Sequence, residues 1–112
     1  MGKKIILDTK KGVCYVCDRA TGTELHHIFY GRKHRRIADE EGLVVYLCPD
    51  CHRGTDGVHG KNGHALDYSL KEMAQEEWER LFIERYPYQR HAKDAAREAW
   101  LRLFGKNYIE EE

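Results

Sequence analysis

The sequence contains no long apolar run, which excludes a membrane-spanning helix from its predicted elements. The longest uninterrupted apolar stretch covers residues 43–48, far fewer than the roughly 20 residues that a bilayer requires. Residues 1–8 lose their apolar character too early for a secretory signal, so none is expected there. We therefore expect a cytoplasmic protein that does not bind membranes.

The chain of 112 residues also lacks net charge, but its charges are unevenly distributed. Residues 1–65 carry eleven basic and eight acidic side chains, together with all four cysteines and six of the seven histidines. A chain of this length has room for one small domain. We predict a single domain over residues 1–112, with the chemistry in residues 12–65 and a helical scaffold in residues 66–108.

Cysteine is scarce, but its spacing is informative. Two Cys-x-x-Cys pairs are separated by thirty residues. Each pair on a tight turn aims two sulfurs at one point, and two such turns form the tetrahedral cage that structural Zn²⁺ prefers. Disulfides would need an oxidising compartment, and a redox motif needs one such pair rather than two. The spacing predicts a structural Zn²⁺ held by Cys14, Cys17, Cys48 and Cys51.

Histidines gather around these cysteine pairs. His26 and His27 follow the first pair, His52 comes directly after the second, and His59 follows seven residues later. Residues 42–47 are rich in apolar and β-branched side chains and predict a strand, with residues 25–29 as its antiparallel partner. Adjacent residues of a strand face opposite sides. His26 and His27 are therefore expected to have different roles, one toward a metal and the other toward a substrate.

A basic segment lies between these two predicted strands. Residues 31–36 are expected to form a loop, and they hold the four positive charges of Arg32, Lys33, Arg35 and Arg36. A DNA backbone is the natural partner of such a segment, through charge-assisted contacts to phosphate. Arg53, beside His52, is a further candidate for a phosphate contact. The alternative is a solvated loop whose charge is offset by the acidic residues 39–41.

The C-terminal half has the apolar spacing of two helices. The first is expected to be capped at residues 67–69 and to run until Pro87 interrupts the pattern. The second carries its apolar residues between Ala92 and Phe104 and is expected to stop at Gly105. We expect these helices to pack on the strand pair. Any apolar stripe that stays exposed would support a homodimer.

Together these motifs resemble a known family. Residues 12–60 are similar to the HNH endonucleases with zinc knuckles. The similarity lies in the order Cys-x-x-Cys, His-His-Ile, and an apolar strand that enters Cys-Pro-x-Cys-His. The later Gly-Val-His and the terminal Phe-Gly-Lys-Asn-Tyr resemble small stand-alone HNH proteins of bacteriophages and prophages. The resemblance implies an α+β fold: a small ββα-metal (His-Me finger, treble-clef-like) core with a two-stranded antiparallel sheet, four-cysteine zinc knuckles and C-terminal helices.

The resemblance also implies roles for the histidines. His26 matches the first motif position, a ligand of the catalytic metal, and His27 matches the general base. His52 matches the last motif histidine, also a metal ligand, and His59 is a candidate further ligand. Imidazole ligands favour Mn²⁺ or Ni²⁺ over Mg²⁺ as the catalytic divalent ion. The chain departs from the family at Gly42, where an asparagine is usual.

We therefore predict a metal-dependent HNH endonuclease that hydrolyses DNA phosphodiester bonds by nicking or double-strand cleavage. The chemistry of the residues agrees with this, because a neutral histidine can accept the proton of an attacking water. Two alternatives stay open. One is a catalytically silent zinc-ribbon protein that binds nucleic acid. The other is a phage recombination accessory factor that works through protein contacts of its helices.

Overall fold

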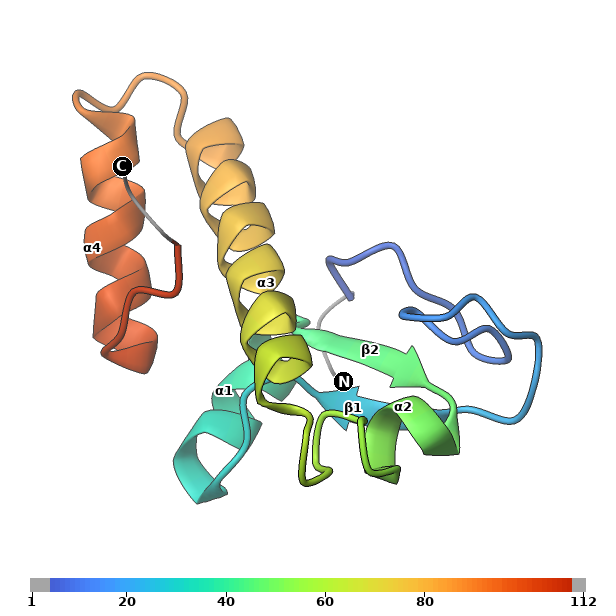
Figure 1. Cartoon of the computed structure of the whole chain (residues 1–112). Helices are drawn as coiled ribbons and strands as arrows, with labels where there is room; N and C mark the ends of the chain where they lie inside the picture. The colour runs from blue at the N-terminus through green and yellow to red at the C-terminus, as the bar shows by residue number, and fades with distance from the viewer. Residues whose placement is uncertain (1–4, 110–112) are drawn as a thin grey trace.

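The computed structural model describes residues 5–109, so part of the N-terminal segment considered above lies outside the described residues. The described chain is a small α+β fold in which two short strands are followed by two long helices (Figure 1). In chain order the elements are β1 (Glu24–His27), α1 (Arg32–Glu41), β2 (Val44–Leu47), α2 (Pro49–Arg53), α3 (His64–Arg85) and α4 (Ala92–Phe104).

The two strands form an antiparallel sheet, as the sequence predicts. His26 pairs with Val45 and His27 with Val44. Both strands are shorter than predicted. Ile28 and Phe29 lie outside β1 because both side chains pack into the hydrophobic core. There the Phe29 ring centroid lies 4.2 Å from the ring centroid of Phe104 on α4. The end of β1 is therefore fixed to the helical half of the fold.

The prediction that residues 31–36 form a loop is wrong, because they begin helix α1. One side of this helix is buried through Ile37 and Ala38, while its charged residues from Arg32 to Glu40 are exposed. The helix ends at Gly42, whose left-handed backbone (φ 74°, ψ 25°) lets its N–H reach the carbonyls of Ala38 and Asp39. The glycine at this position thus has a backbone reason, since most other residues would be strained there.

The two C-terminal helices lie side by side and antiparallel, and the sheet, α2 and the N-terminal loop extend from the other side of α3 (Figure 1). Helix α4 ends at Gly105 as predicted. The predicted cap at residues 67–69 is wrong, because α3 already begins at His64. Asp67 lies inside the first turn, where its carboxylate is buried and accepts hydrogen bonds from Tyr30 and Lys71.

The terminal Phe-Gly-Lys-Asn-Tyr motif ties the C-terminal segment to both helices. Phe104 is buried in the core, and the carbonyl of Lys106 accepts a hydrogen bond from the Trp100 indole at 2.9 Å. The side chain of Gln75 is fully buried on α3, donates to Asn107 and accepts from the backbone N–H of Tyr108. A buried amide satisfied in this way fixes the position of the segment that follows α4.

Within the described residues, none of the helices is both long enough and apolar enough to cross a lipid bilayer.

Candidate metal centres and nucleic-acid interface

Four cysteine sulfurs converge at one end of the sheet. The thiol groups of Cys14, Cys17, Cys48 and Cys51 lie within 4.8 Å of one another. Cys17 Sγ and Cys48 Sγ are 3.8 Å apart, too far for a disulfide and close to the separation of about 3.8 Å that tetrahedral Zn–S bonds of about 2.3 Å impose. Cys48 also caps α2 through a hydrogen bond from the backbone N–H of Cys51. This four-cysteine cluster could hold a structural metal ion.

The protonation of these thiols is compatible with metal binding. Burial opposes ionisation of Cys14, but backbone hydrogen bonds from Cys48, Cys17 and Val16 outweigh it and lower the pKa of Cys14 to about 6. Burial and the neighbouring thiols raise the pKa of Cys51 above its ordinary value. One thiolate thus forms readily, while the last proton leaves only in exchange for a cation. Metal uptake by the four-cysteine cluster is therefore coupled to proton release.

Three histidines form a second cluster on the face of β1 that His26 occupies. The ring centroids of His26, His52 and His59 lie 5.0 to 5.1 Å from one another, and their ligand nitrogens lie within 4.8 Å. His26 is 1% exposed, His52 is half-buried and His59 is exposed. This three-histidine cluster is closed on the protein side and open to solvent on the other. Three protein ligands and an open side are typical of catalytic rather than structural metal sites.

His26 has the properties of a metal ligand. Its Nε2 is buried and has no hydrogen-bond partner, which is costly for a polar atom unless it binds something. Burial and the positive charges of the other two cluster histidines lower the pKa of His26 to about 3. The ring is therefore neutral at physiological pH, which is the form that ligates metals. The three-histidine cluster could hold a divalent ion.

Glu24 holds one of the ligands in place, and the sequence analysis missed it. Its carboxylate is 2.8 Å from His52 Nδ1 and also accepts two hydrogen bonds from Arg53, at 2.9 and 2.6 Å. Hydrogen bonds from Arg53 and His52 lower the pKa of Glu24 to about 2. A carboxylate on Nδ1 leaves His52 Nε2 as the ligand atom. The signal was available: Glu24 lies two residues before His26, hence on the same face of the strand.

We expect Glu24→Gln to weaken divalent-metal binding at the three-histidine cluster by about 10- to 100-fold, because a neutral amide oxygen holds the His52 ring less strongly than the carboxylate does. The measurement is calorimetric titration of Mn²⁺ into protein whose four-cysteine cluster is already loaded. Glu98→Gln is the matched control, since it removes an exposed ion pair with Arg102 on α4. Equal Mn²⁺ affinities for the two variants would contradict an orienting role for Glu24.

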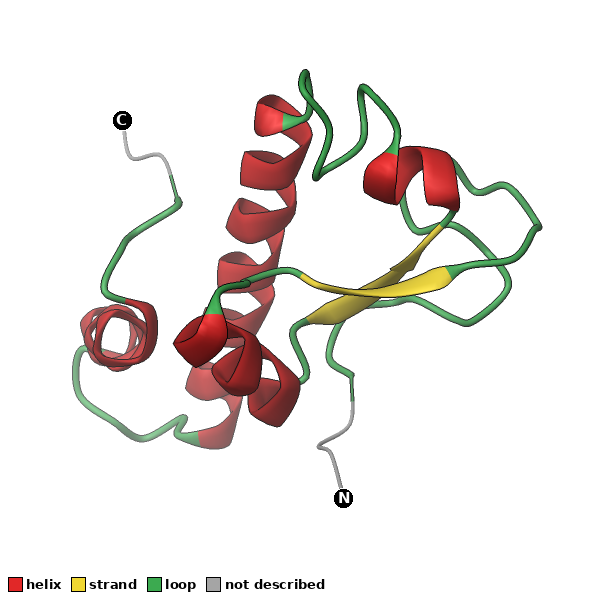
Figure 2. Cartoon of the chain, turned by 90° about the horizontal axis from the view of Figure 1, so that it is seen from below, coloured by secondary structure: helices red, strands yellow, loops and turns green. Residues whose placement is uncertain are grey.

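A glycine-rich coil brings His59 to the three-histidine cluster. Between α2 and α3 the backbone folds back on itself (Figure 2), with hydrogen bonds from Val58 to Cys51 and from His59 to His52, each spanning seven residues. Glycines recur every third residue from 54 to 63. A Cβ at Gly60 or Gly63 would overlap the backbone of the preceding turns. The backbone hydrogen bonds therefore join residues seven positions apart, which is also the spacing that brings His59 to His52. The segment is an ordered, hydrogen-bonded structure.

Three further residues support the three-histidine cluster and were not predicted from the sequence. The Tyr30 ring lies 5.0 Å from that of His59, and its hydroxyl donates to Asp67 at 3.1 Å. Lys71 also donates to Asp67, at 2.6 Å, with its ammonium group 4.3 Å from the Tyr30 ring centroid. A half-exposed aromatic ring and a cation therefore flank the cluster on the α3 side.

His27 lies apart from the cluster, as strand alternation predicts. Its Nε2 is 3.3 Å from Asp39 Oδ1 on α1. With Asp39 it lines a concavity of about 380 Å³ together with three of the predicted phosphate-binding residues, Arg32, Arg35 and Arg36. Lys33 lies on the same helix but does not line the concavity. Arg32 lies one helical turn before the adjacent Arg35 and Arg36, and all three present their charge beside His27.

Arg53 is engaged differently from the other predicted phosphate-binding residues. Its guanidinium is held by Glu24 in a bidentate pair, although the side chain remains 63% exposed. It therefore lies beside His52 at the three-histidine cluster, whereas the α1 arginines lie beside His27. The predicted basic residues are divided between the two faces of β1.

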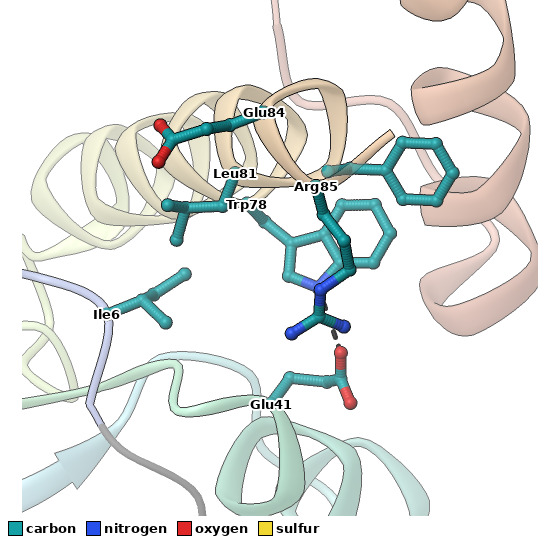
Figure 3. Close-up of a pocket in the computed structure, with 7 residues that line it drawn as sticks. Ile6, Glu41, Trp78, Leu81, Glu84 and Arg85 are labelled. Carbon is teal, nitrogen blue, oxygen red and sulfur yellow. Dashed lines mark hydrogen bonds between the residues drawn. The ribbon is translucent and has the colours of Figure 1, made fainter. Parts of the chain in front are cut away.

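A larger cavity, of about 600 Å³, lies elsewhere (Figure 3). Ile6, Glu41 and the C-terminal half of α3 line it, and the Trp78 indole donates a hydrogen bond to Glu41 at 3.0 Å. It shares no lining residue with the three-histidine cluster or with the α1 concavity. The candidate metal ligands lie at the sheet and not at this cavity.

Comparison with known proteins adds no relative: no protein-family model, curated protein or solved structure matches the chain. What the residues can do follows from their geometry. The four-cysteine cluster is closed, the three-histidine cluster is open to solvent, and a histidine with three arginines lies at the end of the same strand.

Proposed function

We propose that the chain is a metal-dependent endonuclease of the HNH type, with a ββα-metal core that hydrolyses DNA phosphodiester bonds. The observation that carries the proposal is the open cluster of His26, His52 and His59, in which His26 precedes His27 at the end of β1. Three imidazoles, one of which has a buried nitrogen without a partner, form a ligand set for a divalent transition metal. Mn²⁺ and Ni²⁺ suit this set better than Mg²⁺.

The two clusters divide the work. Structural Zn²⁺ on the four cysteines would join the loop before β1, which carries Cys14 and Cys17, to α2. Because α2 also carries His52, this Zn²⁺ would stabilise the position of that ligand. A divalent ion on the three histidines would act as a Lewis acid toward a phosphate oxygen and the leaving 3′ oxygen. Its ligands belong to β1, α2 and the glycine coil, so their relative placement depends on the four-cysteine cluster.

His27 supplies the general base. In its neutral form it takes a proton from a water whose oxygen attacks phosphorus in line with the 3′ oxygen. The P–O3′ bond breaks, and the 3′ oxygen leaves with the bonding pair and takes up a proton from solvent. The products are a 5′-phosphate and a 3′-hydroxyl. His27 is the last residue of β1 and follows His26 directly, so the proposal requires the DNA backbone to cross this end of the strand and contact both His27 and the ion.

Arg32, Arg35 and Arg36 bind the substrate backbone. They project from α1 beside His27, and guanidinium groups bind phosphate through bidentate, charge-assisted hydrogen bonds. Tyr30 offers a half-exposed ring on the other side of the cluster, where Asp67 and Lys71 hold it in place. The basic helix favours DNA as partner over an uncharged substrate.

The test is incubation of the zinc-loaded protein with supercoiled plasmid in EDTA, Mg²⁺, Mn²⁺ or Ni²⁺. Nicked or linear product that requires a divalent ion and disappears in His26→Ala would support the proposal. A folded sample that binds DNA but leaves it uncut in the presence of every metal tested would overturn the proposal. That outcome would favour the silent zinc-stabilised nucleic-acid binder.

The α1 arginines make a separate prediction that does not depend on cleavage. In EDTA, Arg35→Gln should lower the affinity for duplex DNA at low salt and reduce the slope of log K against log salt by about 0.9, the value of one lost phosphate contact. Fluorescence anisotropy at several salt concentrations measures both. Arg102→Gln on α4, which is also an exposed arginine, should leave both unchanged. An equal loss in the two variants would mean non-specific attraction rather than binding at α1.

A further inference from the structure

One carboxylate contacts the histidine that the proposed function makes the general base. Asp39 Oδ1 lies 3.3 Å from His27 Nε2, while the imidazole is only 16% exposed. Asp39 lies in the last turn of α1, where the left-handed backbone of Gly42 ends the helix. Both partners therefore belong to hydrogen-bonded elements, and the contact joins the end of α1 to the end of β1.

The contact determines which ring nitrogen can take a proton. A neutral imidazole has one N–H and one lone pair, and a carboxylate can only accept. Asp39 therefore favours the tautomer with its N–H at Nε2 and leaves the lone pair on Nδ1. Without such a partner the two tautomers exchange and the ring turns more freely. A general base needs its lone pair held toward the water, so this contact bears on rate.

The other charged groups of α1 near His27 do not serve as acceptors for its imidazole. Arg32, Arg35 and Arg36 line the same concavity but have no lone pair to offer an imidazole N–H. Glu40 is the neighbouring acid on α1, and it pairs with Arg36 at 3.9 Å instead. Asp39 is thus the acceptor that the structure gives to His27.

We infer that Asp39 is a positioning residue that holds His27 in the Nε2–H tautomer, with Nδ1 free to accept the proton of the attacking water. The inference rests on the proposed function for the use of Nδ1. It assigns the α1 helix two roles: the arginines set the affinity for the phosphate backbone, and Asp39 sets the reactivity of the base beside it.

The kinetic test compares Asp39→Ala, Asp39→Asn and the control Glu40→Ala. We expect Asp39→Ala to lower kcat by about 10- to 100-fold with KM changed less than about twofold, because an orienting partner is lost and no phosphate contact is. Asp39→Asn should recover part of kcat, since its amide oxygen still accepts the N–H. Glu40→Ala should resemble the unmodified protein. A loss in KM alone, or no recovery with asparagine, would overturn the positioning role.

A spectroscopic test separates this inference from the proposed function. Long-range ¹H–¹⁵N correlation in mildly alkaline buffer reports the tautomer of each neutral histidine in the zinc-loaded protein. His27 should give the pattern of a single Nε2–H tautomer, and Asp39→Ala should shift it toward averaged values. If the plasmid stays intact but this shift occurs, the proposed function fails and Asp39 still positions His27. An unchanged tautomer in Asp39→Ala would overturn the inference even in an active nuclease.

Discussion

Substitution of His27 by alanine is expected to lower plasmid cleavage by about 10²- to 10⁴-fold, the contribution typical of a general base. The variant loses the group that is proposed to take the proton of the attacking water, but it keeps all three residues of the three-histidine cluster. Its fold should persist, because the His27 side chain does not belong to the hydrophobic core. The measurement is the single-turnover rate of nicking at saturating Mn²⁺.

His64→Ala is the matched control for this loss. His64 is an exposed histidine at the start of α3 and belongs to neither cluster. It should cut at the wild-type rate, and both variants should retain the metal of the four-cysteine cluster and the melting temperature. If His27→Ala cut within about threefold of the wild-type rate, another group would be the base and the role proposed for His27 would be wrong.

Removing the metal of the four-cysteine cluster should unfold the protein. Structural zinc contributes on the order of 10 kcal/mol to small domains, comparable to the whole stability of about 5–15 kcal/mol of an ordinary domain. Cys48 is 1% exposed and caps α2, so Cys48→Ser should leave a buried site incomplete and the chain without a cooperative thermal transition. Metal analysis and circular dichroism during heating are the measurements.

His52→Ala is the control, because it removes a ligand of the open cluster from the same short helix. It should keep one equivalent of tightly bound zinc and its melting transition, while losing Mn²⁺ binding. Returning zinc to chelated wild-type protein should restore the transition. If the metal-free chain melted at the same temperature as the loaded chain, metal binding by the four cysteines would not stabilise the fold.

What the sequence could predict depended on short-range regularities. Paired Cys-x-x-Cys spacing led to four sulfurs that do converge. Strand alternation separated His26 from His27, and the structure puts one in the three-histidine cluster and the other beside Asp39. The antiparallel strand pair and the stop at Gly105 followed from apolar pattern and glycine chemistry in the same way. Each of these features is encoded within a few residues of the side chains concerned.

What could not be predicted depended on contacts between distant segments. The run of basic residues indicated a loop, yet the segment is helix α1, whose buried side consists of Ile37 and Ala38. Asp67 has the chemistry of a helix cap, but its partners Tyr30 and Lys71 make it an interior residue. Strand alternation could have placed Glu24 on the same face as His26, but its partner His52 became apparent only when β1 was placed beside α2. In each case a tertiary partner outweighed the local preference.

The glycine coil between α2 and α3 limits how this chain can vary over evolutionary time. Connecting segments are ordinarily where lineages gain and lose residues at little cost. Here backbone hydrogen bonds join residues seven positions apart, so one inserted residue would displace His59 from His52 and leave the proposed metal site with two histidines. The segment that looks least structured in the sequence is therefore expected to be fixed in length, with indels confined to stretches such as residues 86–91 at the far end of the helical hairpin.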